Sequence, residues 1–198
     1  MGEIYEIERN MDYFRPEVPH NTHIFEPYAS YLYAHGSHLL DQVISCFGVP
    51  GRTQFDVRQI LGPGRMNDCF SLDLFYPDLK VILRGSYFRI QPRPSFVIYG
   101  QNGMFVKSTP DRQEADLKRF YFPGNPNFGT DQEADYGLLT WMKDGTLYKE
   151  HNPTEQGDYG LVYDHLYEAI IKHAPQCVTK TQVLAQMDIL EKAISTIM

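Results

Sequence analysis

Apolar and polar residues alternate with a period of two along much of the first half of the chain. In the first run, over residues 4–13, one side carries Tyr5, Ile7, Arg9, Met11 and Tyr13, and the other side is mostly polar. Further runs lie between residues 53 and 106, separated by the turn-forming segments Pro77-Asp78 and Gln101-Asn102-Gly103. No helical pattern interrupts them, so the long crossovers of a parallel sheet have no room there. The pattern predicts an open, predominantly antiparallel sheet.

Helical spacing of apolar residues appears in separate segments. The first covers residues 36–47 and ends at Gly48 and Pro50, and a short exposed helix is expected within residues 110–119. Another hairpin follows at residues 138–150, with Lys143-Asp-Gly145 as its turn. Two helices close the chain: Asp158 can cap the first, and the last begins at Thr179. We expect both to bury their apolar stripes on one face of the sheet, which makes an α+β fold.

Several strands carry apolar residues on both of their sides. Adjacent pairs include Phe75 with Tyr76, Tyr87 with Phe88, and Val97 with Ile98. A strand of this kind has no polar face to leave in water. We therefore expect the sheet face opposite the helices to be covered by a second copy of the chain, in a homodimer.

Composition narrows the classes of partner. The 198 residues suit a single domain, and a formal net charge of -7 lacks the Lys and Arg surplus that nucleic-acid phosphates demand. The first residues, Met1 to Arg9, are charged from the third position and do not resemble a signal peptide. The strongest apolar run, Leu79 to Leu83, is far shorter than the roughly 20 residues of a membrane span. Cytoplasmic localisation is therefore expected, with neither nucleic acid nor membrane as a partner.

The densest cluster of potential catalytic groups lies at the start of the helix expected from residue 36. His38 and Asp41 are three residues apart, so they share a helix face. A carboxylate there can fix the tautomer of the imidazole and raise its basicity, which would make His38 a general base. The commoner alternative is that the pair caps and satisfies the helix N-terminus.

A metal site is a second way to interpret the same cluster. His35, His38 and Asp41 are possible ligands, and His20 with His23 supplies another pair. Three ligands on one helix crowd a tetrahedral ion, and the second pair lies in an expected loop. A metal-dependent sugar isomerase or hydrolase therefore stays the less favoured function. No phosphate-binding glycine loop or nucleophile elbow is present.

Ordered motifs along the chain resemble one known domain. The segment Tyr33–Pro50 contains Gly36-Ser-His38-Leu-Leu-Asp41 and ends in Phe47-Gly-Val-Pro50. It resembles the helix that opens the second domain of the glucose–fructose oxidoreductase and inositol dehydrogenase family (Gfo/Idh/MocA), where Gly-x-His-x-x-Asp leads into Phe-Gly-x-Pro. Further matches follow in order: the strand Phe96–Val106, the helix entry Gly157-Asp-Tyr-Gly160 and the junction Ala174-Pro175. The resemblance covers nearly the whole chain.

This resemblance implies an NAD(P)-dependent dehydrogenase that acts on a sugar, cyclitol or related polyol. Residues 1–198 would be its single C-terminal domain, which binds substrate and mediates oligomerisation. In the family, NAD or NADP is bound mainly by an N-terminal Rossmann domain, which also supplies the lysine of a Glu-Lys-Pro motif. Neither feature occurs in this sequence, so the chain alone is expected to be inactive. A freestanding, non-catalytic binding or structural module derived from that domain is the alternative.

The resemblance also suggests site residues. His38 matches the family histidine and is the expected general base. The family commonly has an aspartate four residues earlier, where this sequence has Ala34, and His35 is expected to project to a different side of the helix. Tyr159 and Arg15 are expected substrate contacts, although a structural salt bridge would suit Arg15 equally well.

Overall fold

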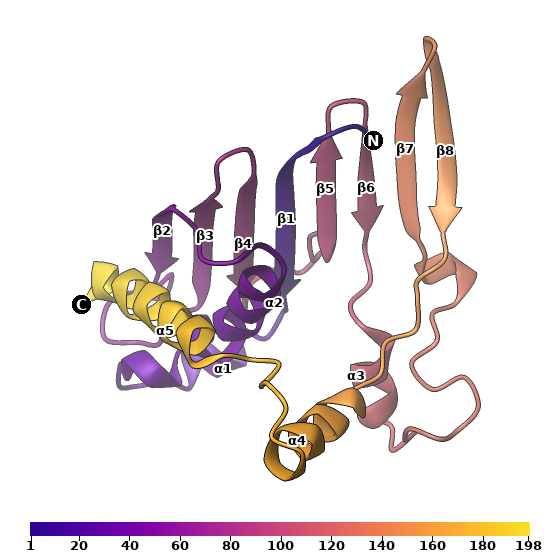
Figure 1. The fold of residues 1–198 in the computed structure, drawn as a ribbon. Helices are drawn as coiled ribbons and strands as arrows, with labels where there is room; N and C mark the ends of the chain where they lie inside the picture. Colours follow the sequence, from indigo (N-terminus) through magenta and orange to yellow (C-terminus); the bar gives the residue numbers. More distant parts are fainter.

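Eight strands form one open sheet in the computed structural model, which describes residues 1–198 (Figure 1). In chain order they are β1 (Ile4–Asp12), β2 (Arg52–Arg58), β3 (Cys69–Phe75), β4 (Lys80–Ser86), β5 (Phe96–Gly100), β6 (Gly103–Lys107), β7 (Gly137–Lys143) and β8 (Thr146–Asn152). Across the sheet the order is β2-β3-β4-β1-β5-β6-β7-β8. The α+β class and the open, predominantly antiparallel sheet are thereby confirmed.

The first strand lies in the middle of this sheet. It pairs antiparallel with β5 and parallel with β4, so that Ile7 stands opposite both Ile98 and Val81. All other neighbours are antiparallel, as expected for residues 53–106. The single parallel pair is a departure from the predicted pattern. It is possible because the connection from β1 to β4 is long enough to include two α-helices and two strands.

Five α-helices accompany the sheet: α1 (Glu17–His20), α2 (Ser37–Phe47), α3 (Arg112–Leu117), α4 (Leu161–Ile171) and α5 (Lys180–Ile194). A π-helical turn at Leu32–Gly36 runs directly into α2, and short 3-10 turns cover Pro27–Ala29, Glu133–Asp135 and Ser195–Ile197. The start of α5 is a capping box, in which Thr179 Oγ1 accepts from the Gln182 backbone N–H and Gln182 Oε1 accepts from that of Thr179. No helix combines the length and hydrophobicity needed to cross a membrane.

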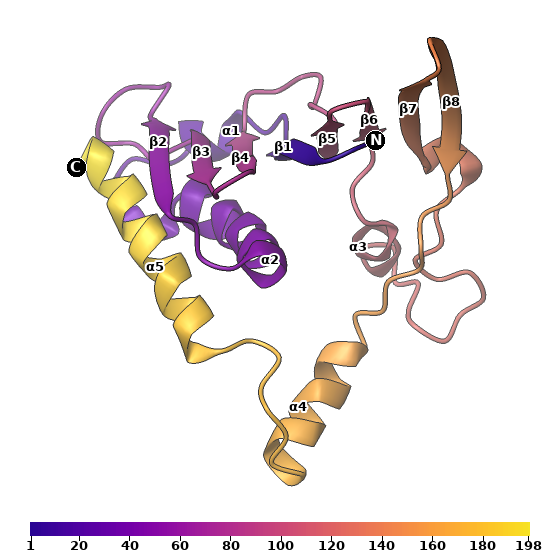
Figure 2. The ribbon, with the colours of Figure 1, turned by 45° about the horizontal axis from the view of Figure 1, so that its top comes forward.

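The hydrophobic core lies between two of these helices and one half of the sheet. Figure 2 shows α2 and α5 side by side beneath β2, β3, β4 and β1. Leu39 and Ile44 of α2 and Leu190 of α5 are at most 1% exposed, and they belong to the same buried cluster as Leu72 and Leu83 of the sheet. Burial of their apolar surface fixes α2, and with it the side chains on the remaining faces of that helix.

Helix α4 is not packed on the sheet, although such packing was predicted for both C-terminal helices. In Figure 2 it lies apart from the strands, and none of its residues is buried. Its large apolar residues are each 48% or more exposed: Leu161, Val162, Tyr163, Leu166, Tyr167, Ile170 and Ile171. An apolar stripe shows that a face requires a partner, but not where in the fold the partner lies. Nor does Asp158 cap this helix as expected, because the N-cap is Gly160, whose N–H donates to the Asp158 carboxylate at 2.7 Å.

The sheet face opposite α2 and α5 has two parts. Cross-strand ion pairs cover the part formed by β3, β4 and β1, with Arg84 bound to Glu8 at 2.8 Å and Lys80 to Asp73 at 2.6 Å. Beyond β1 the face is apolar, because Val97, Val106 and Leu138 stand opposite one another on β5, β6 and β7. Two-sided apolar strands therefore occur mainly in that second half.

Candidate functional site

A cleft of about 620 Å³ opens where the C-terminal end of β1 meets α2 and α3. One wall is formed by the end of β1, from Arg9 to Asp12, and by Tyr13, which follows it. Ala34, His35, His38 and Gln42 lie on this wall as well. Pro92, Arg93 and Ser95 continue this wall, since Arg93 binds Asp12 and Ser95 binds Arg9. The opposite wall is formed by the residues in and around α3 and by the residue that binds Gln113 of that helix: Ser108, Pro110, Asp111, Glu114 and Tyr159. Most of the lining residues have polar side chains, which suits a ligand that is itself rich in oxygen.

Two of the three site residues expected from the sequence line this cleft. His38 is exposed on α2, and Tyr159 lies on the opposite wall, where its backbone N–H donates to Gln113 Oε1 at 2.9 Å. Burial raises the pKa of the Tyr159 phenol above its ordinary value, so it is a hydrogen-bond donor at neutral pH. Arg15 is not part of the lining, and its guanidinium lies 4.8 Å from the centre of the Tyr13 ring.

His35 lies in the same cleft as His38, so the expectation that it projects elsewhere is wrong. The two histidines are three residues apart on a helical stretch that runs from the π-helical turn Leu32–Gly36 directly into α2, and side chains at this spacing share a helix face. Aromatic rings surround the imidazole, with ring centres at 4.3 Å for Tyr31, 5.3 Å for Tyr13 and 5.8 Å for Tyr87. Its Nδ1 is buried without a hydrogen-bond partner.

Burial lowers the pKa of His35 to about 4, and the neighbouring His38 adds a smaller effect in the same direction. The ring is therefore neutral at pH 7. In the unfolded chain its pKa returns to about 6.5, so the unfolded state binds more protons between pH 6.5 and 4, and the free energy of unfolding falls as the pH drops through this window. The stability that His35 contributes is complete only above pH 6.5.

We expect the protein to lose about 1–2 kcal/mol of stability to this residue between pH 7 and pH 5, less than the full shift implies because the imidazole keeps some contact with water. The check is urea unfolding at both pH values for the wild type and for His35→Gln. The variant should show a smaller loss over this interval. Equal losses in the two proteins would contradict the assignment.

Asp41 does not serve His38 in this structure. Its Oδ1 accepts a hydrogen bond from Gln186 Nε2 of α5 at 2.7 Å, and no hydrogen bond or ion pair joins it to His38. It therefore links α2 to α5 instead of orienting the imidazole. The possible metal ligands are not assembled either, because no group of three or more His, Cys, Asp or Glu side chains lies close enough to hold an ion.

Arg9 lines the cleft, although it was not among the site residues expected from the sequence. Its side chain is only 7% exposed, and its guanidinium lies 4.2 Å from the centre of the Phe96 ring. Nε donates to Gln42 Oε1 at 3.0 Å, and Nη1 donates to Ser95 Oγ at 2.7 Å and to the Asn10 carbonyl at 2.9 Å. Burial lowers the pKa of Arg9 to about 10, so it is cationic at pH 7. The sequence feature that could have identified Arg9 as a site residue is its charge on the otherwise apolar side of the first strand.

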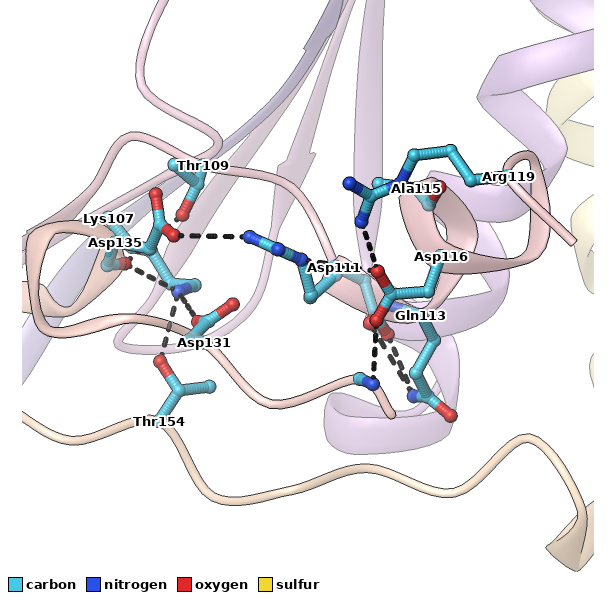
Figure 3. Close-up of polar contacts among 12 residues, drawn as sticks. Lys107, Thr109, Asp111, Gln113, Ala115, Asp116, Arg119, Asp131, Asp135 and Thr154 are labelled. Atoms are coloured by element: carbon cyan, nitrogen blue, oxygen red, sulfur yellow. Dashed lines mark hydrogen bonds and ion pairs between the residues drawn. The ribbon is translucent and has the colours of Figure 1, made fainter. Parts of the chain in front are cut away.

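The wall formed by α3 is fixed by a polar network, shown in Figure 3. The Asp116 carboxylate accepts from the Gly129 N–H at 2.9 Å and pairs with Arg119 and Arg112. The Gly129 N–H, followed by the two arginines, holds the pKa of this carboxyl below its usual range. These contacts tie α3 to the excursion over residues 120–130, which has no regular structure of its own.

A second part of the network holds the segment that directly follows that excursion. Lys107 binds the Asp131 carboxylate and also donates to the Asp135 carbonyl at 2.9 Å and to Thr154 Oγ1 at 3.0 Å (Figure 3). Asp111 is the N-cap of α3, since it accepts from the Gln113 backbone N–H at 2.8 Å. The carboxylate of Asp111 is therefore held in place at the cleft.

Comparison with known proteins gives one consistent result. The family model described as the C-terminal alpha/beta domain of the oxidoreductase family, Gfo/Idh/MocA, matches residues 1–196. The chain is 37% identical over 193 residues to the uncharacterized oxidoreductase YhhX of Escherichia coli, covering 97% of this chain and 55% of that protein. It is 30% identical to scyllo-inositol 2-dehydrogenase (NADP(+)) IolW of Bacillus subtilis, covering 97% and 53%.

Solved structures agree with this result. A crystal structure of the probable oxidoreductase yhhX has a TM-score of 0.87 at 37% identity, and it covers 98% of this chain and 56% of that one. An oxidoreductase from Bacillus cereus has a TM-score of 0.89 at 33% identity, covering 98% and 55%. The chain thus spans about half the length of the relatives that it matches.

Proposed function

Because the chain belongs to the Gfo/Idh/MocA oxidoreductase family, whose C-terminal domain matches residues 1–196, we propose that it is the substrate-binding and dimerisation domain of an NAD(P)-dependent dehydrogenase. The substrate class is a sugar, cyclitol or related polyol. The observation that carries this proposal is the polar cleft with His38 on its wall. The name of the Bacillus subtilis relative, which acts on an inositol and uses NADP, is consistent with it.

In this proposal His38 accepts the proton of the substrate hydroxyl. The imidazole is exposed to the cleft, and proton removal by a positioned base supports departure of hydride from the same carbon. Ala34 lies one helical turn before His38 in the same lining, where the family commonly has an aspartate. A methyl group cannot orient the imidazole, so His38 acts here without a carboxylate from that position. Tyr159 supports substrate binding from the opposite wall.

The residues of this chain do not form a dinucleotide cradle. No glycine-rich turn leads from a strand into a helix, and α2 follows a π-helical turn that lacks such a sequence. When bound, the nicotinamide supplies hydride acceptance. We propose that it is held mainly by an N-terminal Rossmann domain of the full-length protein, which would also complete the cleft.

The test is turnover by the full-length protein. We expect reduction of NAD or NADP, followed at 340 nm, with a panel of scyllo-inositol, myo-inositol and glucose, and no turnover by residues 1–198 alone. A folded full-length protein that reduces neither nucleotide with any polyol of the panel would refute the proposal. That result would favour the alternative, a non-catalytic binding module.

We also propose a cytoplasmic homodimer that forms through the sheet face opposite α2 and α5. The apolar rows of Val97, Val106 and Leu138 support this, because a covered sheet face needs no polar side. Sedimentation of the full-length protein should give the mass of a dimer, and Val106→Lys on β6 should give the mass of a monomer. A monomeric wild type would contradict the proposed dimer.

Recovery of the protein from a membrane or periplasmic fraction would contradict the proposed cytoplasmic location.

A further inference from the structure

Arg9 is a buried cation with unused hydrogen-bonding capacity. Its Nε and Nη1 are both bound to protein acceptors, whereas Nη2 has no acceptor in the protein. Nη2 is also absent from the polar atoms that are buried without a partner, so it is accessible, and Arg9 belongs to the lining of the cleft. A side chain that is 7% exposed therefore presents its free donors to the cleft.

The guanidinium also has no carboxylate partner. None of the ion pairs in the structure includes Arg9, and its four acceptors are neutral oxygens. The other arginine of the cleft, Arg93, differs because it binds both oxygens of Asp12, at 2.7 and 2.8 Å. A buried charge without a counter-ion is unfavourable unless further groups satisfy it. A ligand oxygen at Nη2 would do so.

The bound edges of Arg9 restrict which ligand it can take. Two-pronged recognition of a carboxylate or phosphate requires two adjacent free N–H groups, on Nε and Nη2 or on Nη1 and Nη2. Gln42 occupies Nε and Ser95 occupies Nη1. Only the hydrogens of Nη2 are left. These suit a single hydroxyl oxygen better than the two oxygens of a carboxylate or phosphate.

The opposite wall carries two carboxylates beside the hydroxyl of Tyr159. Asp111 and Glu114 both line the cleft, and Asp111 is close enough to Arg9 for its charge to act on the guanidinium. Hydroxyl groups can donate to these carboxylates and accept from Arg9, since every hydroxyl is both donor and acceptor. A ligand carboxylate or phosphate would instead be repelled by two like charges.

We propose that Arg9 anchors a hydroxyl oxygen of the substrate and that Asp111 and Glu114 make the cleft select a neutral polyol over its anionic counterpart. This inference rests on the proposed function for the identity of the cleft as the substrate site. It adds the anchoring residue, and it excludes sugar acids and sugar phosphates from the preferred substrates.

The test measures binding to the full-length protein without cofactor, by titration calorimetry. The ligands are scyllo-inositol, myo-inositol and the matched pair glucose and glucuronate, which differ only at one carbon. For the wild type we expect at least one neutral polyol to bind and glucose to bind more tightly than glucuronate. Arg9→Met should weaken the binding of neutral polyols at least tenfold. The control Arg58→Met, at an exposed arginine on β2, should change it less than twofold.

Asp111→Asn tests the charge separately, because asparagine keeps the N-cap of α3. It should narrow the preference for glucose over glucuronate at least threefold, and it remains informative if Arg9→Met fails to fold. The inference is overturned if the wild type binds none of the neutral polyols, if it prefers glucuronate, if a folded Arg9→Met binds normally, or if Asp111→Asn leaves the preference unchanged. Arg9-dependent binding without turnover would refute the proposed function alone, and turnover with Arg9-independent binding would refute this inference alone.

Discussion

Replacing His38 by alanine in the full-length protein should lower turnover by a factor on the order of 100 or more. The imidazole lies on α2, lines the cleft and is exposed to it, and it is the group there that can act as a proton acceptor. Its side chain makes no hydrogen bond within the protein, so its removal should leave the melting temperature within about 2 °C of the wild type. Steady-state kinetics and thermal melting check the two halves of this expectation.

Asp41→Asn is the matched control for His38→Ala. Asp41 lies on the same helix but contacts Gln186, and asparagine can still accept that hydrogen bond. Turnover of Asp41→Asn should therefore stay within threefold of the wild type. Unchanged turnover in a folded His38→Ala protein would remove the general-base role. A loss of folding in His38→Ala would instead support the alternative in which His38 stabilises the helix start.

Replacing Leu190 by alanine should destabilise the protein by about 2–5 kcal/mol. Leu190 is 1% exposed and belongs to the cluster between α5, α2 and the sheet. Removing its branched end loses buried apolar surface and leaves a cavity that the neighbouring side chains fill only in part. Urea unfolding, with the free energy extrapolated to water, measures the change.

Leu184→Ala on the same helix is the control, because its side chain is 57% exposed. It should cost less than about 0.5 kcal/mol, because alanine is at least as good a helix former as leucine, and a similar loss in both variants would contradict the role of burial. A loss below 1 kcal/mol for Leu190→Ala would contradict the packing described for α5. Because Gln186 of α5 holds Asp41 of α2, loosening α5 should also raise KM for the polyol before the whole domain unfolds.

The local elements of this fold follow from short-range patterns. The turn between β7 and β8 was predicted from Lys143-Asp-Gly145, and Asp144 and Gly145 do have positive φ, of 50° and 75°. Asp and Gly adopt positive φ with less steric strain than most residues, so the residues of the turn are themselves enough to predict it. The end of α2 at Gly48, with φ of 75°, has the same explanation.

Features that depend on distant parts of the chain were not predicted. The parallel pairing of β1 with β4 places Ile7 opposite Val81. The sequence of either strand alone does not identify the other as its neighbour. The exposure of α4 and the π-helical turn before α2 are of the same kind, since periodicity shows an apolar face but not its neighbour or a local change of helix type.

The candidate site follows the same division. His38 and Tyr159 could be proposed because each belongs to a local motif of the resemblance. Arg9, Asp111 and Glu114 could not, because they meet only when β1 and α3 come to opposite sides of one cleft. Charge on the apolar side of a strand, as at Arg9, is the sequence signal that merits attention in related chains.

The central position of β1 has a consequence for the order of folding. Strands that follow one another in the chain pair within the group β2, β3 and β4 and within the group β5, β6, β7 and β8, but only β1 joins the two groups. Its partners lie some 70 to 95 residues further along the chain, so the loop-closure entropy is high. We expect two hairpin-based units to form early and the insertion of β1 between them to limit the folding rate. A destabilising substitution in β1 would then slow folding more than an equally destabilising substitution in β8.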